Sequence, residues 1–268
     1  MNIKQKIITH HKTLGFDIDS AGYVKSTEEN LLSPYSNWDL IKKEIENGDG
    51  NELSLKKGRI NFNAVHSSCA LCVNNFALVK KYKNKISLFG ASDFEVAVFE
   101  KKLSTGISTP NLDFYLANNS HVIGVESKFS ELLNPKFPNE NLEKYLKKDL
   151  KLPNGFKEVL DSYINCGQKL YLNAAQLLKH IMGLFLIPPS NTKKRLSLVY
   201  LYWVPANWKE IELYQTHEKE IEQFKEKISG FSIKFEAFSY VEFWKLLEKN
   251  LIMQKHVKNL RERYYFEV

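Results

Sequence analysis

The feature that most constrains the fold of this chain is a pair of short apolar runs separated by turn-forming residues. The runs Leu112–Ala117 and His121–Phe129 are rich in β-branched and aromatic side chains, and Asn118-Asn119-Ser120 lies between them. Asn and Ser favour tight turns because their side chains hydrogen-bond to nearby backbone groups. The pattern therefore predicts two strands joined by a hairpin.

Segments on both sides of this hairpin continue the alternation of helices and strands. Apolar residues recur at helical spacing over 63–82 and 171–186, whereas 95–103 and 196–204 have the composition of strands. The predicted order is α-β-β-β-α-β, which is typical of an α/β fold.

The sequence predicts a single domain over residues 1–268, because it contains no internal repeat and no low-complexity linker. Its parts are a polar, helical lead-in (1–62), the core (63–205) and an extension of helix, strand and helix (206–268). Within the core, the Lys-, Asn- and Pro-rich residues 131–169 predict an inserted surface segment with a short helix. We expect the last residues to dock on the core through Val257, Leu260 and Tyr264, and contact with nucleic acid is the alternative.

Composition places weaker limits on the class of protein. The formal net charge of +7 favours a polyanionic partner, because cations placed on phosphates release counterions. The N-terminus lacks the features of a targeting segment and the longest apolar stretch, Ile181–Ile187, is too short to span a bilayer, so we expect a cytoplasmic protein with no membrane association. Cys69 and Cys72 form a CxxC, which fits two thiols on a buried helix face, although a redox pair or half of a zinc site uses the same spacing.

Three charged residues interrupt the apolar hairpin. Side chains alternate along a strand, so Glu126 and Lys128 share one face of the second strand. A turn at 118–120 brings Asp113, on the first strand, next to Glu126. Charge in the middle of a sheet is costly unless it is used or paired.

This set of residues has the chemistry that phosphodiester hydrolysis requires. Two carboxylates can hold Mg²⁺, with Mn²⁺ as a substitute, and the backbone carbonyl of Ser127 is a further candidate ligand. A neighbouring lysine can orient the attacking water or stabilise charge on the phosphate. The alternative is a salt-bridged cluster with no catalytic role.

An ExK pattern occurs twice in the chain, at Glu100-Lys101-Lys102 and at Glu126-Ser127-Lys128. The second copy follows an Asp-bearing strand at the distance of a hairpin. The first has Asp93 upstream, which is too close in sequence for a turn and a paired strand. The context therefore favours the second copy as the catalytic one.

Asp113 and Glu126-Ser127-Lys128, within the α-β-β-β-α-β order, resemble the PD-(D/E)xK nuclease superfamily. This resemblance covers roughly residues 63–205 and implies a restriction-endonuclease-like catalytic core, in which helices flank a central mixed sheet, with helical additions at both ends. It implies a Mg²⁺-dependent DNA nuclease in which Asp113 and Glu126 bind the metal and Lys128 is the catalytic lysine.

The resemblance extends to the helix that follows the motif, although two details depart from it. Gln176 and His180 lie one helical turn apart and are similar to the polar residues that such a helix lends to the site; a buried pair satisfied by backbone is the alternative. Pro110 is not adjacent to Asp113, and the first core helix carries no carboxylate. Glu100 fills that role, or the site binds a single metal ion.

Basic residues are candidates for contact with the DNA backbone. They include Lys144 to Lys151 and the group Lys179, Lys193, Lys194 and Arg195, although a charge run is more often a solvated face. A double-strand nuclease of this fold implies a homodimer. A nucleic-acid-binding protein without turnover and an RNA-directed nuclease remain alternatives.

Overall fold

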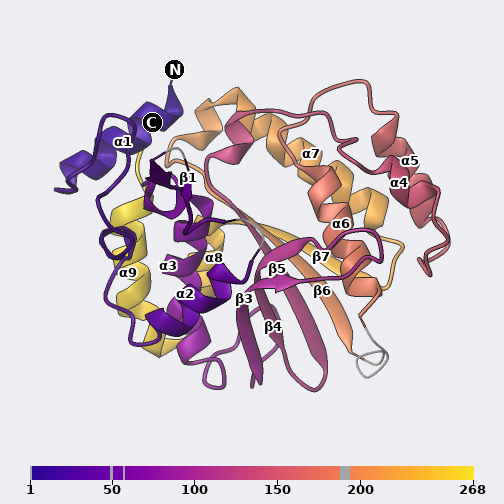
Figure 1. Cartoon of the computed structure of the whole chain (residues 1–268), viewed down its shortest axis with the longest axis horizontal. Helices are drawn as coiled ribbons and strands as arrows, with labels where there is room; N and C mark the ends of the chain where they lie inside the picture. The colour runs from indigo at the N-terminus through magenta and orange to yellow at the C-terminus, as the bar shows by residue number, and fades with distance from the viewer. Residues whose placement is uncertain (1, 49–50, 57, 188–193) are drawn as a thin grey trace.

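A mixed β-sheet forms the centre of the structure, a computed structural model that describes residues 2–48, 51–56, 58–187 and 194–268. Within those residues, five strands pair in the order β3-β4-β5-β6-β7 (Figure 1). The first three are antiparallel, whereas β5, β6 and β7 run parallel to one another. The strands are β3 (Val96–Lys102), β4 (Asn111–Ala117), β5 (His121–Lys128), β6 (Arg195–Tyr202) and β7 (Ile233–Ser239).

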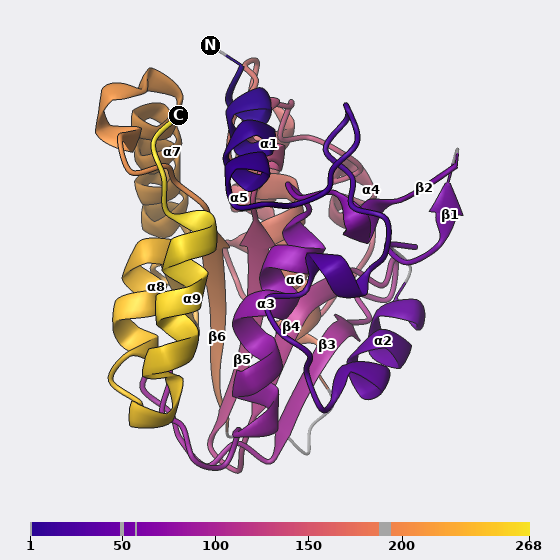
Figure 2. The same ribbon diagram turned by 90° about the vertical axis from the view of Figure 1, so that its left-hand side faces the viewer.

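Helices cover both faces of the sheet (Figures 1 and 2). One face carries α3 (Ser68–Lys81), α8 (Tyr240–Leu247) and α9 (Gln254–Tyr264), and the other carries α6 (Ala174–Phe185) and α7 (Glu212–Ile228). The short helices α4 (Glu143–Leu146) and α5 (Phe156–Ile164) lie outside α6. None of the helices in the described ranges is both long and apolar enough to cross a lipid bilayer.

The lead-in and the C-terminal segment lie against the same helix of the core. The lead-in contains α1 (Ile3–Thr13), α2 (Trp38–Glu46) and a small hairpin of β1 (Leu55–Lys56) and β2 (Arg59–Ile60). The buried side chain of Asn74, on α3, accepts a hydrogen bond from Leu32 N–H at 2.6 Å and donates to the Tyr264 hydroxyl at 2.8 Å. The two ends of the chain consequently lie close together (Figure 1).

The predicted α-β-β-β-α-β order is confirmed as α3-β3-β4-β5-α6-β6. The first helix begins at Ser68 rather than near residue 63, because residues 61–63 form a 3₁₀ turn and Ser67 caps the helix by accepting from Ala70 N–H at 3.2 Å. The insertion contains two helices, α4 and α5, where one was predicted. The strand of the C-terminal extension, β7, joins the central sheet because the crossover through α7 returns the chain alongside β6.

Two further predictions about buried residues are confirmed. Cys69 and Cys72 are free thiols on the inner face of α3, where burial raises the pKa of both thiols well above the usual range. The C-terminal segment docks on the core, since Val257, Leu260 and Tyr264 are all buried. This docking accounts for the apolar side of α9.

Candidate active site

Three carboxylates occupy successive positions across β3, β4 and β5. The β3–β4 register pairs Phe99 with Phe114 and Lys101 with Leu112, which sets Glu100 opposite Asp113. The β4–β5 ladder ends at Phe114 and Val125, and continued by one residue it sets Asp113 opposite Glu126. Neither acidic pair belongs to the hydrogen-bonded ladder. The β3–β4 ladder is therefore interrupted at its acidic pair and resumes at Lys101 and Leu112, whereas the ladder between β4 and β5 ends before Asp113 and Glu126 and the sheet opens there.

Local backbone geometry accounts for this opening. Glu100 has a φ of +51°, in the left-handed region that is unfavourable for side chains other than glycine. On the next strand, Asp113 Oδ2 accepts a hydrogen bond from Ser127 N–H at 2.6 Å, so a side chain replaces a ladder partner. Strained backbone in a folded protein is concentrated at functional sites.

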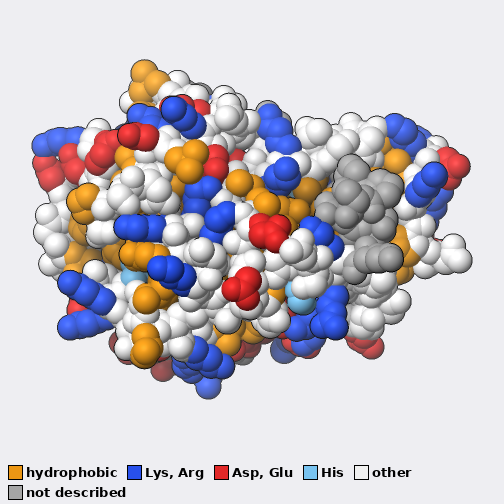
Figure 3. Space-filling view, turned by 90° about the horizontal axis from the view of Figure 1, so that it is seen from below, with side chains coloured by type: hydrophobic (Ala, Val, Ile, Leu, Met, Phe, Trp, Pro, Cys, Tyr) orange, Lys and Arg blue, Asp and Glu red, His pale blue; other side chains and the backbone are white. Residues whose placement is uncertain are grey.

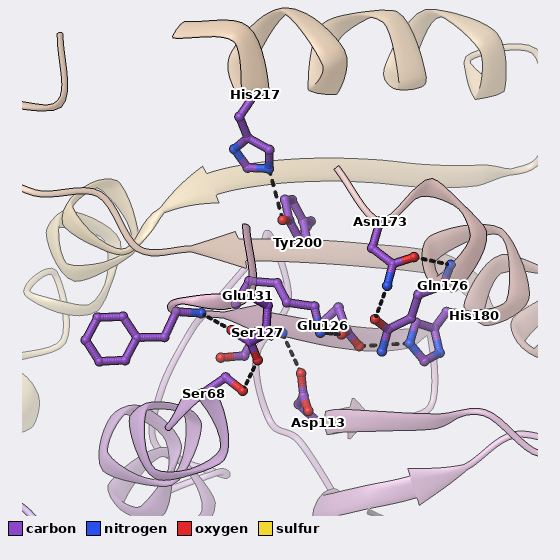
Figure 4. Close-up of polar contacts among 12 residues, drawn as sticks. Ser68, Asp113, Glu126, Ser127, Glu131, Asn173, Gln176, His180, Tyr200 and His217 are labelled. Atoms are coloured by element: carbon purple, nitrogen blue, oxygen red, sulfur yellow. Dashed lines mark hydrogen bonds and ion pairs between the residues drawn. The ribbon is translucent and has the colours of Figure 1, made fainter. Parts of the chain in front are cut away.

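Glu126 is fully buried and held from two sides (Figure 4). Its Oε1 lies 2.5 Å from Nζ of Lys128 and its Oε2 lies 2.8 Å from Nε2 of His180. Burial raises the pKa of Glu126, but Lys128 and His180 outweigh that effect, so the pKa of Glu126 is lowered overall. Glu126 is therefore ionised, and His180 of α6 positions its carboxylate.

The other two carboxylates have elevated pKa values. Burial raises the pKa of Asp113 well above its usual range, and the neighbouring Glu126 carboxylate adds to the rise. Burial likewise raises the pKa of Glu100 to about 7, with further contributions from Glu126 and Glu52. Burial is the main cause of both shifts, and the neighbouring negative charge adds to each.

Lys128 is the ammonium at the centre of this acidic group. Burial disfavours its charged form, but the carboxylates of Glu126, Glu131 and Asp113 outweigh that penalty and raise the pKa of Lys128. Its side chain retains 13% exposure and lines a cleft together with Tyr200, Asn173 and Gln176. The amine therefore stays cationic and can be reached from the cleft.

Ser127 joins the acidic group to the helices behind the sheet. Its hydroxyl is 2.6 Å from the Tyr240 hydroxyl of α8, while its N–H is bonded to Asp113. The neighbouring Lys128 carbonyl accepts from Trp203 N–H at 2.9 Å and so points toward β6. Because successive carbonyls alternate in direction, the Ser127 carbonyl points toward β4, beyond the end of its ladder. That direction suits the ligand role predicted for it.

The structure brings together Asp113, Glu126, Lys128 and His180, with Glu100 beside them. Gln176 lies one turn before His180 on α6, lines the cleft, and its Oε1 accepts from Asn173 Nδ2 at 3.2 Å. The predicted alternative for Gln176 and His180, a pair satisfied by backbone, does not describe either residue, because each contacts a side chain.

The candidate DNA-contacting lysines do not join this group. Lys179 is half-buried, and burial lowers its pKa. Arg195 pairs with His121 at the start of β6, whereas Lys128 pairs with Tyr202 at the end of β6. Arg195 and Lys128 therefore lie about 23 Å apart along the strands. Lys194 precedes Arg195, and Lys193 lies outside the described residues. Seen from that end of the sheet, cationic side chains are scattered among acidic, apolar and neutral ones (Figure 3).

Two acidic residues near Lys128 were missed in the sequence. Glu131 accepts from Phe129 N–H at 2.9 Å and from the Ser68 hydroxyl, and it lines the cleft. Glu52, in the lead-in, has a pKa raised by burial and by Glu131. Glu131 follows Lys128 by only three residues, so its place near Lys128 could have been predicted from the sequence. The approach of Glu52 to Lys128 depends on the tertiary fold.

The acidic group is not a closed metal cage. Across the described ranges, no three His, Cys, Asp or Glu side chains are arranged to hold a metal ion. The predicted oxygen donors are the carboxylates of Asp113 and Glu126 and the Ser127 carbonyl. In this structure Asp113 Oδ2 accepts from Ser127 N–H, and the two Glu126 oxygens lie against Lys128 and His180. Such hard oxygen donors suit Mg²⁺, which keeps several waters and needs one or two carboxylates.

Comparison with known proteins identifies a family for this chain. No curated protein and no solved structure matches the chain significantly. A sequence model of one family, described as Restriction Endonuclease associating with ARP, matches residues 4–265. The match covers nearly the whole chain and includes every residue of the acidic group. The predicted restriction-endonuclease-like fold is thereby confirmed, and the chain belongs to this restriction endonuclease family.

Proposed function

We propose that the protein is a Mg²⁺-dependent DNA endonuclease that hydrolyses phosphodiester bonds with a metal-activated water. Membership of a restriction endonuclease family supports a nuclease-type function. The metal would be held by Asp113, Glu126 and the Ser127 carbonyl, with Glu100 as a further candidate ligand. Mn²⁺ would occupy the same position.

The surplus of carboxylates over cations is the observation that carries this proposal. Four carboxylates interact electrostatically with Lys128, namely those of Glu52, Glu100, Asp113 and Glu131. Lys128 is already paired with a fifth, that of Glu126. A purely structural salt bridge requires one acid for one base. Extra carboxylates beside such a pair, three of them half-buried and Glu131 exposed, destabilise it unless another cation joins them.

Each residue has a distinct part in the proposed reaction. Bound Mg²⁺ supplies polarisation of the phosphate and a water of lowered pKa. Lys128 faces the cleft as a cation and stabilises negative charge that develops on the phosphate oxygens. His180 fixes the orientation of Glu126, and the Gln176 amide contributes a polar group on the cleft wall. His180 is thus a positioning residue.

The proposal is tested by incubating the protein with supercoiled plasmid in Mg²⁺, in Mn²⁺ and in EDTA. We expect nicked and linear DNA with either metal and intact plasmid in EDTA. Matched DNA and RNA duplexes are compared in parallel, and faster cleavage of the RNA would favour an RNA-directed nuclease. Binding of DNA without cleavage under every metal condition would overturn the nuclease assignment in favour of a binding protein.

A homodimer is part of the same proposal, because a two-fold symmetric pair of active sites can cut both strands of a duplex in one binding event. Sedimentation equilibrium of the protein bound to a DNA duplex in the presence of Ca²⁺ measures the number of protein chains per duplex. We expect two protein chains per duplex. One chain per duplex, together with linear products from plasmid, would contradict the dimer.

The elevated carboxylate pKa values predict how stability depends on pH. Glu100 has a pKa of about 7 in the folded protein, above the roughly 4.3 of an unfolded glutamate. Between these values the folded state binds more protons than the unfolded state, so raising the pH through this window removes stability. Asp113, whose pKa is also raised, acts in the same direction.

We therefore expect the melting temperature of the metal-free protein to fall as the pH rises from about 7 to about 9. Below this range the effect is opposed by His11, His66, His217 and His256, because burial lowers the pKa of each and the unfolded chain then binds more protons. Mg²⁺ should raise the melting temperature more at the upper end of this range, because ligands must be deprotonated to bind metal. Differential scanning calorimetry at several pH values measures both effects. A Mg²⁺ effect that is equal at all pH values would argue against these carboxylates as ligands.

A further inference from the structure

Two segments of the connection between β5 and α6 lie at the edge of the cleft. They are residues 136–137 and 169–171, and we call them the cleft wall. Lys136, Leu170 and Tyr171 line the cleft, and Phe137 and Lys169 adjoin these residues outside it. Lys136 N–H donates to the Leu170 carbonyl at 2.9 Å, and Leu170 N–H donates to the Lys136 carbonyl at 2.8 Å. These reciprocal bonds hold the two segments side by side, although they are more than thirty positions apart in the sequence.

The side chains of the cleft wall combine positive charge with aromatic surface. Lys136 and Tyr171 line the same cleft as Lys128. Phe137 leaves 48% of its surface exposed, and Nζ of Lys169 lies 5.6 Å from the centre of its ring. Exposing a phenylalanine to water costs free energy, which binding a flat apolar partner recovers.

We propose that the cleft wall binds the nucleic-acid strand beside the scissile phosphate, with Phe137 stacked on a nucleobase and Lys136 and Lys169 paired with phosphates. This inference rests on the proposed nuclease function and names how its substrate is held. Aromatic rings stack on bases without regard to sequence, and lysines contribute non-specific affinity for the backbone. The cleft wall has both groups within one rigid pair of segments.

Charge and position favour a nucleic acid over other occupants. Lys136 and Lys169 are exposed cations next to Phe137, which suits a polyanion. The acidic residue on this side of the cleft, Glu131, already has its carboxylate oxygens hydrogen-bonded to Phe129 N–H and the Ser68 hydroxyl. Lys136 lines the cleft together with Lys128, so a strand whose phosphate pairs with Lys136 lies next to the proposed catalytic residues.

A base that stacks on Phe137 must present a free face. Bases within a duplex are already stacked, so the base belongs either to a single-stranded segment or to a nucleotide rotated out of the helix. The shared chemistry is the flat face of a nucleobase. The two sources are separated by comparing a single strand with a duplex of the same sequence.

The test measures the binding of labelled single-stranded and duplex DNA by fluorescence anisotropy, in the presence of Ca²⁺. A 2-aminopurine base in the duplex reports, through its fluorescence, whether a base is unstacked. We expect Phe137→Ala to weaken binding about tenfold and Phe137→Trp to preserve it. Lys136→Ala should weaken binding several-fold and lower the salt dependence by about one phosphate contact.

Two matched controls lie outside the cleft wall. Leu251→Ala removes an exposed apolar side chain that precedes α9, and Lys258→Ala removes an exposed lysine on α9. Both should bind DNA as the parent does. A loss confined to the single strand identifies a single-stranded base, whereas a loss with the duplex together with loss of the 2-aminopurine signal identifies a rotated base.

Suppose that the parent protein binds and cleaves DNA. If Phe137→Ala and Lys136→Ala then both bind DNA as the parent does, the proposal for the cleft wall is overturned and the nuclease proposal stands. If the parent binds DNA, the variants lose binding and no metal supports cleavage, the cleft wall stands and the nuclease proposal fails. A parent that binds neither form of DNA overturns both.

Discussion

Replacing Lys128 with methionine is expected to lower the rate of Mg²⁺-dependent DNA cleavage at least about a hundredfold, the cost of losing a charged group aimed at the transition state. Methionine has a similar length and keeps the packing of the buried stem. DNA binding should change little, because one partly buried amine contributes little to the whole interface. Single-turnover cleavage of a labelled duplex at saturating protein measures the chemical step.

The same substitution should tighten metal binding, since it removes a cation from beside the carboxylates. Isothermal titration with Mn²⁺ checks this second effect. The matched control is Lys80→Met, because Lys80 is similarly buried and its Nζ lies 2.8 Å from Glu44 Oε1. Lys80→Met should lower stability and leave cleavage intact. Parent-like cleavage by Lys128→Met would remove this residue from the catalytic group.

Asp113→Asn is expected to abolish measurable cleavage and yet to stabilise the metal-free protein. The amide keeps an oxygen that accepts from Ser127 N–H but removes an ionisable carboxyl group whose pKa is raised by burial and by Glu126. Functional residues often cost stability in this way. Thermal melts at about pH 8, where the carboxylate is ionised to the greatest extent, should show a higher melting temperature than the parent without metal.

Metal titration completes this experiment. Mg²⁺ should raise the melting temperature of the parent but not that of Asp113→Asn, because a ligand has been lost. Asp93→Asn is the control, since Asp93 is an exposed residue of the loop that precedes β3. A Mg²⁺ response in Asp113→Asn as large as that of the parent would exclude Asp113 as a ligand.

The central hairpin and its acidic residues could be predicted because the signals are local. Apolar alternation identifies β4 and β5, and the turn at 118–120 sets their register, so the relation of Asp113 to Glu126 follows from counting. Helical spacing similarly placed His180 on the helix that covers this part of the sheet. Such features depend on residues close in sequence.

Other parts of the site depend on contacts that are distant in sequence. The left-handed conformation of Glu100 has no signature in its neighbours, and the approach of Glu52 follows from the path of the lead-in. Basic composition marked Arg195 as a candidate, but the parallel pairing of β5 and β6 carries it to the opposite end of the sheet from Lys128. Composition alone does not indicate which end of a strand a charge occupies.

Shared coordination of a divalent ion by Asp113 and Glu126 is the central claim of this account. Crystals soaked in Mn²⁺ and measured at the manganese absorption edge test it directly. We predict an anomalous peak between the two carboxylates, beside the Ser127 carbonyl. Manganese bound elsewhere, with no peak between Asp113 and Glu126, would contradict the claim.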